Sequence, residues 1–213
     1  MSVRRIWVLF AILGLHAPVG AAADSARATS LDKPSPYMRV FGQAHPPYGF
    51  VHFCEAFAAE CAPGPAEERR FRPTPEALSE LDEVNRAVNH AIQPTTDLEL
   101  YGVSEHWTLP PGKGDCEDYA LLKRSILLRR GWPASALLMT VVRDELGEGH
   151  AVLTARTAQG DFVLDNKVED VKLWHKTPYE FVMRQSYLNP RVWMVLDVRE
   201  ARSLAQLAGV FAR

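Results

Sequence analysis

Helix-forming segments precede a series of strand-forming segments in this chain, and this order restricts its fold more than any other feature. Residues 74–92 carry apolar side chains at spacings of three and four, with Thr74 suited to the N-cap and Pro75 to the first turn. A second helix is expected over residues 116–130, ending at Gly131-Trp132-Pro133. Because its apolar residues lie on more than one face, this helix should be largely buried.

The segments after residue 130 are predicted to form a sheet. Residues 150–156 and 161–165 flank the turn Thr157-Ala158-Gln159-Gly160, a pattern typical of a β-hairpin. Further strands are expected over residues 137–143 and 192–198, with a short helix over residues 178–187 before the last of them. Helices followed by strands predict the α+β class, with N-terminal helices packed on a mostly antiparallel sheet.

The first 23 residues have the pattern of a secretion signal. Arg4 and Arg5 precede an apolar run over residues 6–15, and Ala21-Ala22-Ala23 forms a small-residue cleavage site before Asp24. The run is shorter than the roughly 20 apolar residues that a membrane-spanning helix needs. We therefore expect residues 1–23 to be removed, leaving one domain over residues 24–213 outside the cytoplasm; an uncleaved anchor is the alternative.

Charge and cysteine content narrow the function further. The formal net charge is −2 with both signs mixed, which argues against a nucleic-acid partner. The chain has three cysteines, and in an oxidising compartment Cys54 and Cys61 can pair around a short helix expected near residues 52–59. Two free buried thiols are the alternative at these positions. In either case Cys116 is left unpaired, which indicates a reactive thiol.

Cys116 lies where a loop becomes a helix. Gly112 and Gly114 permit a tight loop, and Asp115 suits the N-cap of the helix that follows. In the first helical turn, the partial positive charge favours a thiolate, and free backbone N–H groups can hold an oxyanion. Taken alone, the same residues also fit a capped helix that contains an inert buried cysteine.

The predicted hairpin supplies a base and an acid for this thiol. His150 and Asp165 would face each other if the turn is centred between Thr157 and Ala158. A carboxylate beside one imidazole nitrogen leaves the other nitrogen for a thiol, as Cys-His-Asp chemistry requires. The alternative gives both residues structural roles, in a strand and in a turn.

Three acidic residues lie next to Cys116 in the sequence, and they indicate a cation-binding site. Asp115, Glu117 and Asp118 would raise the pKa of the thiol and suppress the thiolate. A hard cation held by these oxygens would cancel the repulsion, and calcium suits carboxylate ligands outside the cytoplasm. Solvated helix-cap residues with no ion are the alternative.

Five sequence blocks together resemble a known family. They are Tyr101-Gly102-Val103, Trp107, Gly114-Asp115-Cys116-Glu117-Asp118-Tyr119-Ala120, Gly149-His150-Ala151-Val152-Leu153 and Leu164-Asp165-Asn166. They are similar to blocks of the bacterial transglutaminase-like cysteine peptidases, a group that includes the LapG-type periplasmic proteases that release large biofilm adhesins. The resemblance covers roughly residues 53–196. The short stretch from Trp107 to Gly114 and the C-terminal segment differ from the adhesin-cleaving members and suggest a separate branch.

This resemblance implies several properties. The fold would be papain-like, of the transglutaminase type, with a catalytic triad of Cys116, His150 and Asp165. The enzyme would be periplasmic and calcium-dependent, with Asp115, Glu117 and Asp118 as calcium ligands. It would act on a protein substrate, such as a surface adhesin, and a regulatory receptor in the inner membrane would be a second partner.

Three functions are consistent with these residues. The first is an exported endopeptidase that acts through an acyl-enzyme on Cys116. The second is a protein transamidase, in which an amine replaces water in the second step. The third is a calcium-stabilised binding module without activity, against which the intact Cys116, His150 and Asp165 argue.

Overall fold

The computed structural model describes residues 34–64 and 70–197. The predicted signal peptide, residues 1–23, lies outside the described residues. The described helices are α2 (Tyr48–Ala56), α3 (Pro75–Ala91), α4 (Asp97–Tyr101) and α5 (Cys116–Arg129). The strands are β1 (Gly42–Ala44), β2 (Gln93–Pro94), β3 (Lys113–Gly114), β4 (Leu137–Arg143), β5 (Gly149–Thr157), β6 (Gly160–Leu164), β7 (Lys172–Leu173), β8 (Glu180–Gln185) and β9 (Trp193–Val195).

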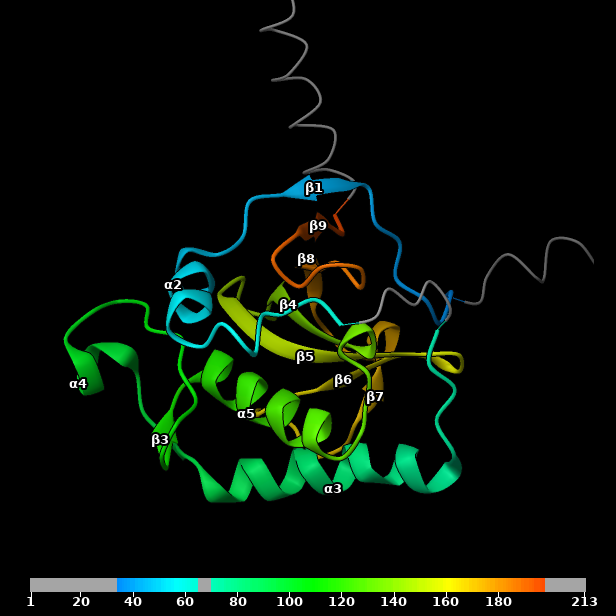
Figure 1. Cartoon of the computed structure of the whole chain (residues 1–213), viewed down its shortest axis with the longest axis horizontal. Coiled ribbons are helices and arrows are strands. Elements are labelled where there is room, and N and C mark those ends of the chain that lie inside the picture. The colour runs from blue at the N-terminus through cyan, green and yellow to red at the C-terminus, as the bar shows by residue number, and fades with distance from the viewer. Residues whose placement is uncertain (1–33, 65–69, 198–213) are drawn as a thin grey trace, which may run out of the picture. The chain divides into compact units, whose positions relative to one another are not determined.

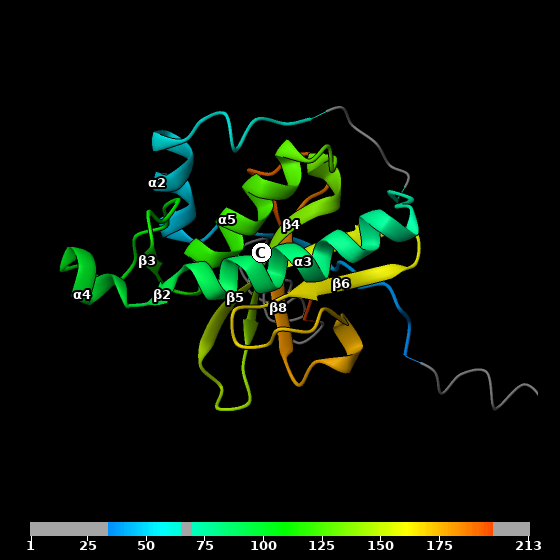
Figure 2. The same ribbon diagram turned by 90° about the horizontal axis from the view of Figure 1, so that it is seen from below.

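Seven of these strands form one sheet. Its order is β1-β9-β8-β4-β5-β6-β7, and every neighbouring pair is antiparallel. Helix α5 packs on β4 and β5, and α3 packs along α5 and against β6 (Figure 1). The view from below in Figure 2 shows α3 crossing α5. The predicted α+β class, with helices packed on a mostly antiparallel sheet, is confirmed.

Helix α3 begins and packs as its sequence predicts. The Thr74 side chain accepts a hydrogen bond from the backbone N–H of Ala77, and Pro75 occupies the first helical position. Leu81, Val84 and Val88 form its buried stripe. This stripe covers α5, which is itself buried over most of its length.

Within the part of the chain that the structure describes, none of the helices has the length and apolar character needed to span a bilayer.

A two-stranded parallel pair joins the end of α3 to the start of α5. Gln93 in β2 pairs with Lys113 in β3, and the N–H of Thr95 donates to the carbonyl of Gly114 at 3.0 Å. This pairing places the segment that leads into α4 beside the residues that open α5. It therefore brings together two parts of the chain about 20 residues apart.

The hairpin of β5 and β6 forms, but its register differs from the prediction. Thr157 pairs with Gly160 and Leu153 with Leu164, so the predicted direct pairing of His150 with Asp165 is wrong. The turn is centred one residue later than this pairing requires, so the opposing position moves by two residues and each side chain keeps its face. His150 and Asp165 are therefore diagonal neighbours on one face, with Asp165 just beyond the end of β6.

The predicted helix over residues 178–187 is also wrong. This segment forms β8, which pairs with β4 on one side and β9 on the other. The side chain of Gln185 accepts from the N–H of Met139 at 2.8 Å, and Arg184 is buried. Pairing on both edges satisfies the backbone better than an isolated short helix would, so tertiary context overrides local propensity.

A disulfide bond joins Cys54 and Cys61, as predicted. Both cysteines belong to the main hydrophobic core, together with Phe50 and Phe53 of α2. The helix itself begins earlier than expected, at Tyr48, and ends at Ala56. The bond therefore anchors the C-terminal end of α2 to the turn that follows it.

Candidate active site

Cys116 is the first residue of α5, as the loop pattern predicts. Asp115 occupies the N-cap position, but its carboxylate does not cap the helix. The half-buried thiol of Cys116 is free of disulfides. Its Sγ accepts from the backbone N–H of Ala151 at 3.4 Å and donates to a carboxylate oxygen of Glu117 at 3.2 Å. The thiol is therefore held between the helix start and strand β5.

His150 and Asp165 are brought together by the hairpin of β5 and β6. Nε2 of His150 lies 2.9 Å from Oδ1 of Asp165, and both side chains are buried. The backbone N–H of Lys167 donates to the same oxygen at 2.9 Å. Because Nε2 faces the carboxylate, Nδ1 is the imidazole nitrogen left for another partner.

Tyr179 completes this arrangement and was missed by the sequence analysis. Its hydroxyl donates to Oδ2 of Asp165, and its ring stands edge-on to that of His150 with centroids 5.6 Å apart. Burial raises the pKa of Asp165, but hydrogen bonds from His150, Tyr179 and Lys167 outweigh it and hold the pKa below its usual range. The carboxylate is thus kept ionised. No local signal marks Tyr179, because its segment was expected to be helical.

Cys116 and His150 line one cavity of about 250 Å³. Trp107 and Glu105 form another part of its wall, and Met183 of β8 also lines it. A cavity that exposes a thiol and an imidazole together can hold a scissile carbonyl between them. The distance between the two side chains is set by α5 and β5, which pack directly on each other.

An acidic cluster lies beside Cys116. Asp97, Asp115 and Glu117 each offer one carboxylate oxygen, and these oxygens all lie within 4.8 Å of one another. Among the described residues, Oδ1 of Asp97 and Oδ1 of Asp115 have no hydrogen-bond partner although they are buried. Buried carboxylate oxygens without donors are costly and fit a cation. Asp97 was not predicted from the sequence; the β2–β3 pairing brings it to Asp115.

Asp118 lies outside this cluster. One of its oxygens accepts from the backbone N–H of Thr108 at 2.8 Å, and the side chain is fully buried. Burial, with the nearby charges of Asp115 and Asp97, raises its pKa to about 7. Of the three predicted ligands, the structure brings Asp115 and Glu117 together, whereas Asp118 binds Thr108 through one oxygen and leaves the other buried without a partner.

Burial and the charges around the thiol oppose its ionisation. Burial raises the pKa of Cys116 far above its usual range, and the charge of Glu117 adds to this effect. Burial, with the charge of Asp115, raises the pKa of Glu117 to about 9, and burial raises the pKa of Asp97. These directions agree with the expectation that neighbouring carboxylates suppress the thiolate unless positive charge is supplied.

Lys123 is a second buried charge that the sequence analysis did not identify. It is 1% exposed, two helical turns after Cys116, and its Nζ lies 5.8 Å from the ring centroid of Tyr119. Burial lowers its pKa to about 7. A lysine in this state weakens the fold near neutral pH, because the ammonium form loses its hydration.

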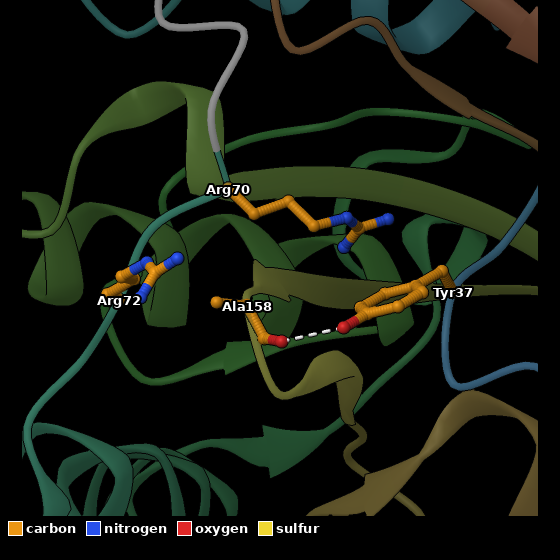
Figure 3. Close-up of a pocket in the computed structure, with 4 residues that line it drawn as sticks. All are labelled: Tyr37, Arg70, Arg72 and Ala158. Carbon is orange, nitrogen blue, oxygen red and sulfur yellow. Dashed lines mark hydrogen bonds between the residues drawn. The ribbon is translucent and has the colours of Figure 1, made fainter.

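A separate hollow of about 480 Å³ lies between Tyr37, Arg70, Arg72 and Ala158 (Figure 3). The Tyr37 hydroxyl donates to the carbonyl of Ala158 at 2.7 Å, and Arg70 pairs with the buried carboxylate of Asp161. None of Cys116, His150 and Asp165 lines it. These contacts tie the segment before β1 to the β5–β6 turn, which is a structural role.

The helix-covered antiparallel sheet and the thiol at the start of α5 define a transglutaminase-like cysteine peptidase. The sequence model of the family described as bacterial transglutaminase-like cysteine proteinase, BTLCP, matches residues 40–201. The chain belongs to this family. No curated protein matches the chain.

Solved structures of LapG from Legionella pneumophila resemble the chain in fold. The calcium-bound structure is 21% identical, with a TM-score of 0.48 over 68% of this chain and 77% of that one. The EGTA-treated structure is also 21% identical, with a TM-score of 0.48 over 70% and 77%. A third LapG structure is 21% identical, with a TM-score of 0.47 over 71% and 80%.

Proposed function

We propose that this cysteine peptidase cleaves polypeptides through an acyl-enzyme on Cys116, with His150 and Asp165 completing a triad. One observation carries the proposal. Cys116 and His150 line the same cavity, and Nε2 of His150 lies 2.9 Å from the carboxylate of Asp165. This observation supports the order of nucleophile, base and orienting acid.

The reaction follows from these positions. His150 takes the thiol proton while Sγ of Cys116 attacks the scissile carbonyl, and the N–H groups of the first turn of α5 face the developing oxyanion. His150 then gives the proton to the leaving amine as the carbon–nitrogen bond breaks. Water hydrolyses the thioester with His150 again as base. Asp165 fixes the tautomer and orientation of the imidazole throughout.

Calcium is the cofactor in this proposal, with Asp97, Asp115 and Glu117 as ligands. The unpartnered oxygens of Asp97 and Asp115 and the short separations within the cluster fit a hard cation that prefers carboxylates. When bound, calcium supplies positive charge that offsets the repulsion between these carboxylates and a thiolate at Cys116. Asp118 anchors Thr108 through one oxygen, and its other oxygen is buried without a partner, so its place among the ligands stays a prediction.

Export to the periplasm and action on a surface protein complete the proposal. The N-terminal pattern of residues 1–23 supports export, and the oxidised pair Cys54–Cys61 suits a compartment outside the cytoplasm. A surface adhesin is the substrate class that the family resemblance implies. The test is to compare the surface proteins released by cells that carry wild-type enzyme and cells that carry Cys116→Ala.

A second experiment tests the chemistry without knowledge of the substrate. Iodoacetamide should alkylate Cys116 of the purified protein at neutral pH with calcium present, and His150→Ala should slow the reaction by about 100-fold, within the usual range for a lost base. His90→Ala is the matched control, because His90 is an exposed residue of α3. A Cys116 that stays unreactive in the wild-type protein would refute the proposal.

A further inference from the structure

The cavity at Cys116 shares two lining residues with a second hollow. This hollow, here named the α2 groove, measures about 580 Å³ and is lined by one face of α2, by Phe57 and by residues 103–108. Trp107 and Glu105 belong to the lining of both hollows. They therefore form the boundary at which the α2 groove meets the cavity that holds Cys116 and His150.

We propose that the α2 groove binds a bulky apolar side chain of the polypeptide substrate, within a few residues of the bond cleaved at Cys116. This inference rests on the proposed function and deepens it by naming a substrate class. An extended chain advances about 3.3 Å per residue. A substrate that crosses the boundary at Trp107 thus reaches the α2 groove within a few residues of the scissile bond.

The lining of the α2 groove suits an aromatic or large aliphatic side chain. Phe53 is buried in its wall, whereas Tyr48 and Val103 are 74% and 46% exposed. Large apolar side chains that stay exposed around a hollow mark a surface that an apolar ligand covers. Its volume lies within the range of ligand sites, roughly 300 to 1,000 Å³.

The α2 wall of the groove is rigid. A Cβ atom at Gly49 would overlap Cδ1 of Trp107 and crowd Cγ of Glu105, so the indole packs directly on the backbone of α2. The disulfide between Cys54 and Cys61 fixes the other end of the helix. A wall held in this way favours binding, because little ordering is needed when the ligand binds.

The opposite wall, formed by residues 103–108, is held in place by hydrogen bonds to acidic residues near Cys116. The backbone N–H of His106 donates to Asp97, and that of Thr108 donates to Asp118 at 2.8 Å. Trp107 lies between these two anchors and is 5% exposed. This wall of the α2 groove is thus held by acidic residues that lie near the reactive thiol, which favours the substrate as occupant.

The first experiment profiles cleavage of a proteome-derived peptide library by mass spectrometry. Wild-type enzyme should prefer Phe, Tyr, Trp or Leu at one fixed position near the cleaved bond by about 10- to 100-fold, the gain expected from burying such a side chain. Ala56→Trp should fill the α2 groove and remove the preference, since Ala56 is an exposed lining residue. Ala87→Trp, at an exposed position of α3, should retain it.

The second experiment separates the groove from the chemistry. Cys116→Ala is titrated with synthetic peptides of Ala, Ser and Gly that carry one Phe, and with the same peptides without Phe, using tryptophan fluorescence. One outcome would support the α2 groove as a binding site and refute the proposed function. In it, wild-type enzyme cleaves no peptide, the Phe peptides bind Cys116→Ala about tenfold more tightly than the peptides without Phe, and Ala56→Trp abolishes this gain in affinity. Equal binding of both peptides, or a cleavage preference that Ala56→Trp leaves unchanged, would overturn the inference.

Discussion

Replacing Tyr179 with phenylalanine removes one hydrogen bond from the carboxylate of Asp165 and leaves the aromatic ring beside His150 in place. The hydroxyl is the donor to Oδ2, whereas Oδ1 keeps its partners His150 and Lys167. A hydrogen bond to a charged group contributes about 1.5 to 3 kcal/mol. At 1.36 kcal/mol per pKa unit, the pKa of Asp165 should rise by about one to two units.

The sign of the pH effect follows from the role of Asp165. Its pKa is lowered in the folded protein, so its contribution to stability is present at neutral pH and is lost as the pH falls through the folded pKa. In Tyr179→Phe this loss begins at higher pH. The acid limb of the activity profile should therefore move up by about one to two pH units, with a smaller change near pH 8.

The assay is the rate of Cys116 alkylation by iodoacetamide from pH 4 to pH 9, with calcium present and folding checked by thermal unfolding. Tyr37→Phe is the control, because the Tyr37 hydroxyl donates to the carbonyl of Ala158 in the separate hollow of Figure 3. If the profile of Tyr179→Phe coincides with those of Tyr37→Phe and wild type, Tyr179 does not hold the carboxylate and the reasoning is refuted.

Three further predictions concern the acidic cluster, the disulfide and the buried lysine. Asp97→Asn should weaken calcium binding at least about tenfold in calorimetry and reduce the thermal stabilisation by calcium, whereas Glu145→Gln, at an exposed turn position, should change neither. Equal affinity in both variants would exclude Asp97 as a ligand. Replacing Cys54 and Cys61 with serine should lower the free energy of unfolding by about 2.5 kcal/mol, measured in urea; an unchanged midpoint would contradict this. Lys123→Met should raise the stability at pH 7, and because the folded pKa of about 7 lies below the usual value, this advantage should shrink by about 1.4 kcal/mol per pH unit up to pH 10. A pH-independent difference would show that Lys123 titrates normally.

Local sequence signals predicted the elements whose boundaries depend on neighbouring residues. Thr74 and Pro75 set the start of α3, and β4 spans residues 137–143 as expected. The pairing of Cys54 with Cys61 was equally accessible, because the two cysteines are only seven positions apart in the sequence. In each case the interacting groups are close in sequence, so spacing and residue type are enough to predict the local structure.

Contacts between distant segments were decided by the tertiary structure. The helix predicted over residues 178–187 was wrong because the two strands that pair with β8 stabilise an extended conformation that its own residues do not favour. Tyr179 reaches Asp165 only because the chain enters β8 in an extended form. The hairpin was predicted with the right face but the wrong pairing, since alternation determines the face and the turn geometry determines the register.

The sequence by itself determined that Cys116 opens a helix and that acidic residues surround it. Only the tertiary structure decided which carboxylates meet, because the short pairing of β2 with β3 brings Asp97 to Asp115 while Asp118 turns toward Thr108. Side chains within one helical turn are positioned by the helix itself. Their partners from other segments depend on backbone pairing and packing over long separations, which no local pattern encodes.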